Sequence, residues 1–187
     1  MKLEFRQATR EDLPEIVRML ADDFLGATRE RYENPLPESY VKAFEEIAAD
    51  KNNELIVAVM SEPHTVAGGL NDANKVSDNL SEKPVATASG SDLAANETIV
   101  GTLQITFTPS ISFQGGKRAG VESVRVDAKF RGQGLGKELM LWAIERAKSE
   151  GCYVLQLTTN SDRTDAHRFY ENLGFKGTHL GMKLYLK

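Results

Sequence analysis

The run VRVDAKFRGQGLGKELM, residues 124–140, joins a valine-rich segment to an amphipathic one through the turn RGQGLG at 131–136. Three glycines alternate in this turn, at Gly132, Gly134 and Gly136. Glycine loses more backbone freedom on ordering than any other residue, so three of them in six positions require a reason. The order strand, glycine turn, helix predicts unpaired N–H groups and the positive end of a helix dipole at one place. Because no Ser, Thr, Asp or Asn occupies the cap position, a phosphate is the natural acceptor for these donors.

The spacing does not fit two common phosphate-binding loops. A P-loop requires G-x-x-x-x-G-K-[ST], whereas Lys137 is followed by Glu138. A dinucleotide fingerprint requires G-x-G-x-x-G early in a βαβ unit, whereas these glycines lie two-thirds of the way along the chain. On spacing alone, a purely structural turn from strand to helix stays open as the alternative.

Composition restricts the class of protein. The chain has 187 residues, 41% of them hydrophobic and 27% charged, which suits one compact domain spanning 1–187. Its net charge of −4 gives no general electrostatic case for a nucleic-acid partner or an anionic membrane. No apolar run approaches the ~18–20 residues of a membrane span. The single cysteine, Cys152, excludes an intrachain disulfide, so we expect a reducing, cytoplasmic location.

Hydrophobic periodicity predicts alternating strands and helices. We expect strands at 3–8, 54–60, 98–108, 121–126 and 152–159, helices at 13–24, 40–48, 134–150 and 166–173, and one or two short strands after Phe175. The segment 61–97 lacks aromatic residues and is rich in Ala, Ser, Asn, Gly and Asp. It cannot bury enough apolar area to offset its ordering entropy, so we predict a flexible insertion there, with a lid or partner-binding arm as the alternative.

Two motifs resemble the hallmarks of the GNAT superfamily of N-acetyltransferases. The first is the acyl-CoA motif [RQ]-x-x-G-x-[GA] after a valine-rich strand, whose positions are occupied by Arg131, Gly134 and Gly136. The second is the run DAHRFYENLGF at 165–175, which is similar to the family's last helix and turn; the matching residues are Ala166, Phe169, Tyr170, Gly174 and Phe175. The motifs stand in the right order and at the right separation, and the resemblance covers most of the chain except the insertion.

The resemblance implies a fold and a reaction. The fold would be α+β, a mixed αβα sandwich whose central sheet splays between the strands at about 121–127 and 152–159, with helices on both faces. The reaction would move an acetyl group from acetyl-CoA to a primary amine by direct attack in a ternary complex, with no metal. Small metabolites, antibiotics and protein amines all remain open as acceptors. A homodimer is suggested only by analogy with family members that dimerise.

Two other functional classes remain open. The first is a non-catalytic acyl-CoA-binding or regulatory domain of the same fold. The second is a phosphate or nucleotide binder of different chemistry, which would require the two motif matches to be accidental. No nucleic-acid or membrane partner is expected in any of these cases.

The resemblance also assigns cofactor contacts. The glycine turn would bind the CoA pyrophosphate, and the strand before it would pair with the pantetheine arm. Many members carry an asparagine three residues before the helix alanine, but that position is Arg163 here, so either Asn160 serves instead or Arg163 pairs with a phosphate. Helix capping by Asn160, Ser161 or Thr164 is the alternative. The predicted cofactor-binding residues are Val124, Arg125, Val126, Arg131, Gly132, Gln133, Gly134, Leu135, Gly136, Lys137, Asn160 and Arg163.

Two residues are predicted to be catalytic. Tyr170 is similar to the family's general acid, with a buried core tyrosine as the alternative. Glu122 is the candidate base, on the strand face of Val124 and Val126; the resemblance implies that it acts through water, as a glutamate does at this place in several family members. Among valines it would be desolvated, which favours a base. The alternative for Glu122 is a charged strand end at the solvent edge. A backbone N–H near Val126 is the expected oxyanion donor.

The acceptor site is expected between the first two helices, around residues 24–40, and the loop at 109–118. Acidic residues there would suit a cationic acceptor: Asp22, Asp23, Glu30 and Glu33. The three histidines have no metal-ligand spacing.

Overall fold

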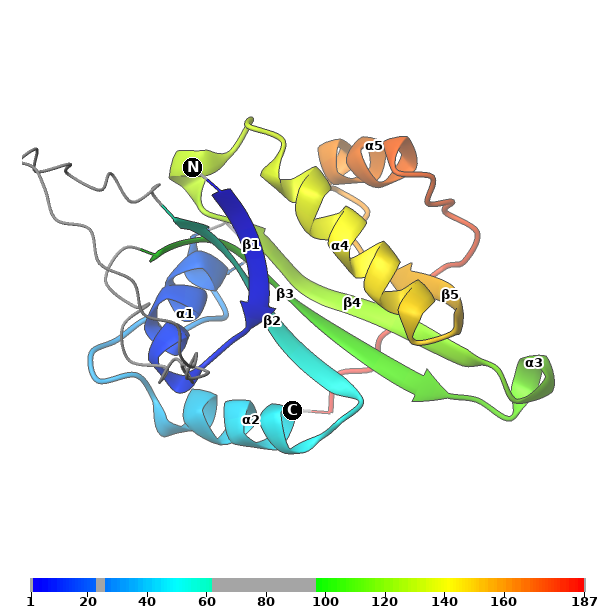
Figure 1. The fold of residues 1–187 in the computed structure, drawn as a ribbon, viewed down its shortest axis with the longest axis horizontal. Coiled ribbons are helices and arrows are strands. Elements are labelled where there is room, and N and C mark those ends of the chain that lie inside the picture. Colours follow the sequence, from blue (N-terminus) through cyan, green and yellow to red (C-terminus); the bar gives the residue numbers. More distant parts are fainter. Residues whose placement is uncertain (1, 23–25, 62–96, 187) are drawn as a thin grey trace, which may run out of the picture.

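A computed structural model describes residues 2–22, 26–61 and 97–186 of the chain. Within them, five strands form one mixed sheet in the order β1-β2-β3-β4-β5 (Figure 1). Neighbouring strands are antiparallel except for β4 and β5, which are parallel and joined by a helical crossover. The strands are β1 (Lys2–Gln7), β2 (Asn53–Ser61), β3 (Glu97–Pro109), β4 (Lys117–Val126) and β5 (Cys152–Leu157).

Helices cover both faces of this sheet (Figure 1), which confirms the predicted α+β architecture. The longest helix, α4, packs on β3, β4 and β5, whereas α1 packs on the opposite face. The helical elements are η1 (Arg10–Asp12), α1 (Leu13–Ala21), α2 (Glu38–Ala49), the single turn α3 (Ser112–Gly115), η2 (Ala128–Phe130), α4 (Leu135–Ser149) and α5 (Thr164–Asn172). None of the helices described is long and apolar enough to cross a membrane.

The core lies mainly between the sheet and α4. Ile56 and Ala58 of β2 contribute to this cluster, while Val57 and Val59 face α1 on the other side of the sheet. Because side chains alternate along a strand, a strand covered on both faces must be apolar at every position, as the sequence ELIVAVM predicts. The main cluster is completed by Val100, Leu103, Ile105, Phe107, Ala119, Val121, Leu139, Met140, Ala143 and Ala147.

The structure differs from the sequence predictions in two regions. Strand β4 begins at Lys117, four residues before the predicted start at Val121, because Lys117–Gly120 pair with both β3 and β5. The predicted final strands are wrong, since residues 176–186 form neither helix nor strand. Alternation of apolar residues gives a segment two faces, but a strand also requires a partner strand, and this segment pairs with none of the described strands. Residues 62–96 of the predicted insertion lie outside the described residues.

Candidate active site

An extra residue interrupts β4 near its end. Thr102 of β3 pairs with Arg125, and Gln104 pairs with Glu122, so Leu103 lies opposite both Ser123 and Val124. This two-against-one count is a β-bulge, and Ser123 adopts the left-handed φ of 54° that such a bulge can require. Bulges bend and twist the strand that carries them, which changes where its last residues lie.

Beyond this region β4 and β5 separate. Their parallel pairing runs only from Lys117–Val121 to Cys152–Leu157, and residues 122–126 of β4 pair with β3 alone. The predicted splay is therefore present. Along these last residues, the side of β4 away from β3 faces no other strand of the described residues. Its backbone groups can pair with an extended ligand, except where a side chain already binds them, as Arg131 does at the Val126 carbonyl.

The glycine turn follows this free strand end and begins α4. Gly132 and Gly134 have φ of 78° and 83°, a conformation that side chains disfavour, and no atom lies within 4 Å of where their Cβ would be. Within the described residues, none of the five consecutive N–H groups of residues 132–136 donates to an acceptor. Hydrogen bonding inside α4 begins only afterwards, with the N–H groups of Lys137 and Glu138 donating to Gly134.

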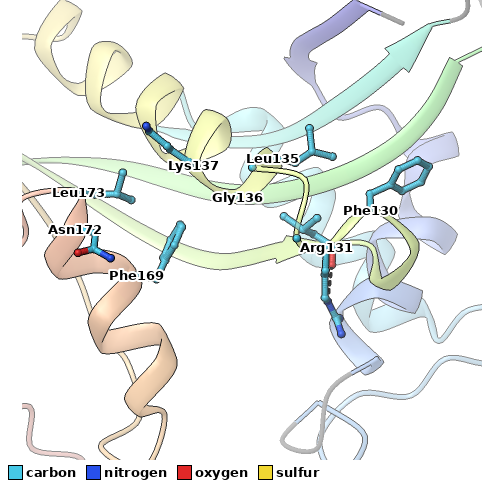
Figure 2. Close-up of a pocket in the computed structure, with 11 residues that line it drawn as sticks. Phe130, Arg131, Leu135, Gly136, Lys137, Phe169, Asn172 and Leu173 are labelled. Atoms are coloured by element: carbon cyan, nitrogen blue, oxygen red, sulfur yellow. Dashed lines mark hydrogen bonds between the residues drawn. The ribbon is translucent and has the colours of Figure 1, made fainter.

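A cavity of about 500 Å³ opens at this turn. Figure 2 shows Phe169 and Asn172 of α5, with Leu173 directly after it, on one side of the cavity, and Phe130 and Arg131 on the other. The floor is bare backbone from the glycine turn, and the walls are largely apolar. The lining consists of Val126, Phe130, Arg131, Gly132, Gly134, Leu135, Gly136, Lys137, Phe169, Asn172 and Leu173.

Two ion pairs connect α1 and the residue after it to the segment 127–131, which leads into the glycine turn. Arg18 pairs with Asp127, which is buried and also accepts a hydrogen bond from the Lys129 N–H at 2.8 Å. One helical turn later, Asp22 Oδ2 accepts from Arg131 Nη2 at 2.9 Å, while Arg131 Nε donates to the Val126 carbonyl at 3.2 Å. Because Arg18 and Asp22 are four residues apart, they share one face of α1. That face holds both ends of the segment 127–131.

The model of the acetyltransferase (GNAT) family matches residues 17–175 of the chain. The splayed pair of parallel strands and the N–H groups at the start of α4, which no described residue binds, agree with this match. The chain belongs to this family. GNAT members are acyltransferases that use acetyl-CoA, and the resemblance noted in the sequence is thereby confirmed.

Individual relatives agree with this assignment. Aminoalkylphosphonate N-acetyltransferase of Salmonella typhimurium is 41% identical over 59 residues, which are 32% of this chain and 38% of that protein. Glucosamine 6-phosphate N-acetyltransferase of Trypanosoma brucei brucei is 37% identical over 89 residues, 47% and 58% of the two chains. The chain thus spans less than two thirds of these curated relatives. A solved structure described as a transcriptional regulator from Bacillus halodurans is 47% identical, covers 99% of this chain and 100% of its own, and has a TM-score of 0.76.

Seven of the predicted cofactor-binding residues of this GNAT chain line the cavity, and five do not. Those in the lining are Val126, Arg131, Gly132, Gly134, Leu135, Gly136 and Lys137. Val124 instead packs against the main core, and Arg125 Nη1 donates to its carbonyl at 2.9 Å. Gln133 Nε2 approaches the Lys129 carbonyl at 3.4 Å.

Asn160 and Arg163 also lie outside the cavity lining. The Asn160 carboxamide oxygen accepts from the Asp162 N–H at 3.0 Å, and its carbonyl accepts from the Arg163 N–H at 3.1 Å. His167 Nε2 lies 3.0 Å from the same carbonyl. Asn160 thus organises the turn before α5. The alternative of helix capping is wrong, because the N-cap position of α5 is Arg163 and no side chain caps the helix. A CoA contact for either residue stays a prediction.

Tyr170 lies on the inner face of α5, between two other aromatic rings. Its ring meets Phe169 and Phe175 edge-on, with centroids 5.1 and 5.8 Å away. Burial raises the pKa of the Tyr170 hydroxyl above its ordinary value of 10.0, although Arg163 and Arg125 oppose the shift. No described residue forms a hydrogen bond with this hydroxyl. The Tyr170 hydroxyl is therefore protonated at neutral pH, and it does not donate its proton to any described residue.

Glu122 is exposed, so it is not desolvated by valines as the sequence suggested. The bulge is the reason, because it breaks the alternation on which that expectation rested. Val121 belongs to the main core and Val124 packs against the same cluster, which leaves Glu122 on the opposite face from both. That face is the one on which α1 lies, away from α4. Its role as a base stays a prediction.

The acidic residues expected to receive a cationic acceptor are mostly engaged elsewhere. Asp22 pairs with Arg131. Glu30 accepts a hydrogen bond from the Tyr40 hydroxyl at 3.0 Å, and Glu33 pairs with Arg31. Asp23 lies outside the described residues. The structure thus gives no support to an acidic acceptor pocket formed by these side chains.

Sequence reasoning missed four lining residues: Phe130, Phe169, Asn172 and Leu173. Phe169 is a match of the second motif and Leu173 ends the predicted helix 166–173, but no sequence signal marks either as part of a cavity. Asn172 lies three residues after Phe169, on the same side of α5, and its place in the cavity depends on how α5 packs beside the glycine turn.

The remaining reactive groups have structural surroundings. Burial raises the pKa of the half-buried Cys152 thiol above its ordinary value of 9.0, which keeps it a thiol. Among the residues that the structure describes, no group of three or more His, Cys, Asp or Glu side chains could hold a metal ion.

Proposed function

We propose that this protein is an N-acetyltransferase that transfers an acetyl group from acetyl-CoA to a primary amine by direct attack in a ternary complex. The observation that carries the proposal is the cradle of five N–H groups at 132–136 that donate to no described residue, next to the end of β4 that β5 does not pair. A pyrophosphate would satisfy these donors, and the free strand end suits the amide groups of a pantetheine arm. Arg131 and Lys137 would add positive charge.

The chain's own groups can manage the protons of this reaction. The amine nitrogen forms a bond to the thioester carbonyl carbon, the carbon–sulfur bond breaks, and the thiolate requires a proton. Tyr170 is proposed to donate that proton, because its raised pKa keeps it protonated. An alkylammonium with a pKa near ~10.4 must lose a proton before attack, which we assign to Glu122 through water.

We further infer that the acceptor carries both an amine and a phosphate or phosphonate. The two curated relatives are named for such acceptors, aminoalkylphosphonate and glucosamine 6-phosphate. In this chain, Arg118 and Glu122 lie on the same face of β4, opposite the buried Ala119 and Val121. Arg118 is exposed and makes no ion pair with any described residue. Arg118 would thus bind the anionic group of the acceptor and Glu122 would accept the proton of its amine. The two residues are about 13 Å apart along the backbone of β4.

Replacing Arg118 tests this acceptor class. Arg118→Gln should raise KM for a phosphorylated amine about tenfold or more, since a charge-assisted contact is lost. It should leave KM for a matched amine without the phosphate unchanged. Equal effects on both amines, measured by thiol release, would refute the assignment of Arg118.

Thermal unfolding tests the cofactor. Acetyl-CoA at ~100 times its dissociation constant should stabilise the protein by about 2.7 kcal/mol, whereas ATP and NAD should not. An unfolding temperature that does not change at saturating acetyl-CoA would indicate that the glycines have a purely structural role. Thiol release with a panel of phosphorylated and plain amines then tests for catalysis.

A regulatory acyl-CoA-binding domain is the second candidate, favoured by the description of the 47% identical Bacillus halodurans structure as a transcriptional regulator. Its signature would be saturable acetyl-CoA binding without thiol release from any amine, together with binding to DNA. The net charge of −4 argues against the DNA contact.

A further inference from the structure

The face of β3 and β4 opposite α4 carries polar side chains along its length. Residues that lie directly opposite one another in an antiparallel pair point to the same face of the sheet. The residues between them, namely Ile105, Phe107, Ala119 and Val121, are buried in the main core on the other face. Three opposed pairs form this polar strip: Gln104 with Glu122, Thr106 with Gly120, and Thr108 with Arg118.

The polar strip is accessible and leads toward the gap beside β4. Thr108, Arg118 and Glu122 are exposed, and the other members are half-buried. Figure 1 shows β3 and β4 running on to α3, away from α1 and α2. Glu122 directly follows Val121, the last β4 residue that pairs with β5. The Glu122 end of the strip is therefore next to the place proposed for the thioester arm, and the Arg118 end is the distant one.

Gly120 leaves the middle of the polar strip without a side chain. Its φ is not in the left-handed region, so the backbone does not require glycine here. A Cβ at this position would meet one atom within 4 Å, the Thr106 Oγ1 at 3.1 Å. Glycine weakens a strand interior and often marks the close approach of a ligand. Gly120 thus keeps the path between Arg118 and Glu122 clear.

Two side chains of β3 can bind hydroxyl groups of a molecule on this path. Thr106 Oγ1 lies 3.5 Å from the Gly120 carbonyl oxygen, the long limit of a hydrogen bond, so this hydroxyl can bind a ligand instead. Gln104 Nε2 donates to Asn53 Oδ1 at 3.0 Å, which holds the carboxamide in place beside Glu122. Because this contact uses the amide nitrogen, the carboxamide oxygen is left to accept from a ligand.

We propose that the acceptor is a phosphorylated amino sugar whose ring lies across Gly120, with its hydroxyl groups bound by Thr106 and Gln104. The inference rests on the proposed function and names the carbon skeleton of the acceptor. Arg118 would bind the phosphate, and the Thr108 hydroxyl directly opposite would be a second donor. A plain alkyl chain would leave the hydroxyl and the carboxamide without partners, which costs affinity, whereas a sugar satisfies both.

Two phosphorylated amines test the skeleton. Glucosamine 6-phosphate and 5-aminopentyl phosphate have the same number of bonds between nitrogen and phosphorus, but only the sugar carries hydroxyl groups. In thiol-release assays at saturating acetyl-CoA, wild-type kcat/KM should be about tenfold or more higher for the sugar. Thr106→Val, which removes the hydroxyl at nearly constant size, should lower this ratio about tenfold. Thr106→Ser, which keeps the hydroxyl, and Thr98→Val, at the other end of β3, should retain the wild-type ratio.

Gly120→Ala tests the path across the strand. The added methyl group would crowd Thr106 and should raise KM about tenfold for both amines, since both cross this position. The acetyl-CoA-dependent thermal shift should be retained, because Gly120 does not line the cavity, and the shift establishes that each variant is folded.

Three results would overturn the inference alone: equal use of the two amines by the wild type, a Thr106→Val protein with the wild-type ratio, or unchanged KM values in Gly120→Ala. Thiol release from neither of the two amines would also refute it. Thiol release from no amine of the wider panel would refute the proposed function as well.

Discussion

At Tyr170, burial in an aromatic cluster and the lack of a hydrogen-bond acceptor among the described residues leave a hydroxyl whose proton can be transferred. Burial raises its pKa, while the guanidinium groups of Arg163 and Arg125 favour the phenolate and limit the rise. This combination suits a general acid, which must be protonated before it acts and must tolerate a negative charge afterwards.

Tyr170→Phe should therefore separate binding from chemistry. We expect kcat to fall about 10²-fold or more, the scale of a lost general acid, with the acetyl-CoA dissociation constant unchanged. In the wild type, the alkaline limb assigned to Tyr170 should lie above pH 10.0, because its pKa is raised. Phe175→Leu, which changes a neighbouring ring outside the cavity lining without removing a proton, is the control. A Tyr170→Phe enzyme with unchanged kcat would exclude the acid role.

Glu122→Gln tests the base at the same scale. Turnover should fall at neutral pH, where the acceptor is an ammonium, and the deficit should shrink as the pH approaches the amine pKa near ~10.4. Glutamine keeps the size of the side chain, so a deficit independent of pH would indicate a structural role. A pH profile of kcat/KM for both proteins provides the measurement.

At the scale of elements, two glycines of the turn that begins α4 are present for different reasons. Gly134 needs a positive φ, while its missing Cβ would have met no atom. Gly136 has no such φ, and a Cβ there would lie 3.6 Å from Phe169 and 3.7 Å from Val126, an ordinary contact. Gly134 is thus required for its backbone conformation, whereas Gly136 is not required by the free protein and leaves space above the turn for a ligand.

The two glycines should therefore respond differently to the same substitution. Gly134→Ala should lower the free energy of unfolding by about 1–2 kcal/mol, because alanine disfavours a left-handed φ. Gly136→Ala should cost little in the free protein, and any effect should appear in acetyl-CoA affinity. Thermal unfolding of both variants with and without acetyl-CoA checks the difference; equal losses without ligand would contradict it.

Elements defined by strong local patterns could be predicted from the sequence, and elements defined by partners could not. The apolar run of β2, the amphipathic face of α4 and the two GNAT motifs all lie within short windows. The bulge at Ser123 has no such signal, since serine rarely adopts a positive φ and no glycine marks the position. The misplacement of Glu122 followed from that single unpredicted residue.

The prediction of strands in the C-terminal segment 176–186 was wrong for the opposite reason. Its alternation is clear, but secondary structure is completed by a pairing edge that sequence periodicity does not specify. Asn172 marks a further limit, because its place in the cavity depends on how α5 packs beside the glycine turn.

For the whole molecule, buried carboxylates paired with arginines connect segments far apart in sequence. Asp12 pairs with Arg6 at 2.7 Å, Glu54 with Arg146 at 2.6 Å, and Asp127 with Arg18. Burial alone would raise the pKa of Asp12 and of Asp127. Hydrogen bonds from Arg6 and the Thr9 N–H for the first, and from the Lys129 N–H and Arg18 for the second, hold both below the ordinary 3.8.

A depressed carboxyl pKa stabilises the folded state above the unfolded pKa, and this contribution is lost as the pH falls through the folded pKa. The free energy of unfolding should thus decline below about pH 5. Asp127→Asn should lose about 1–3 kcal/mol at neutral pH and show a shallower acid decline. Glu145→Gln, at an exposed pair with Lys148, should change stability by less than about 0.5 kcal/mol. The free energy of unfolding of each protein is measured by denaturant titration from neutral to acid pH. An Asp127→Asn protein with the same values as the wild type would contradict the prediction.

The bulge in β4 has a consequence for how this site can be found or lost. The gap beside β4 begins where one surplus residue lies between Glu122 and Val126, so we expect it to depend on the number of residues there more than on their chemistry. An alanine scan keeps that number constant and would pass over the feature. A library of single-residue deletions would not, because removing Ser123 should restore regular alternation to the end of β4 and shift the backbone groups that would bind the thioester arm.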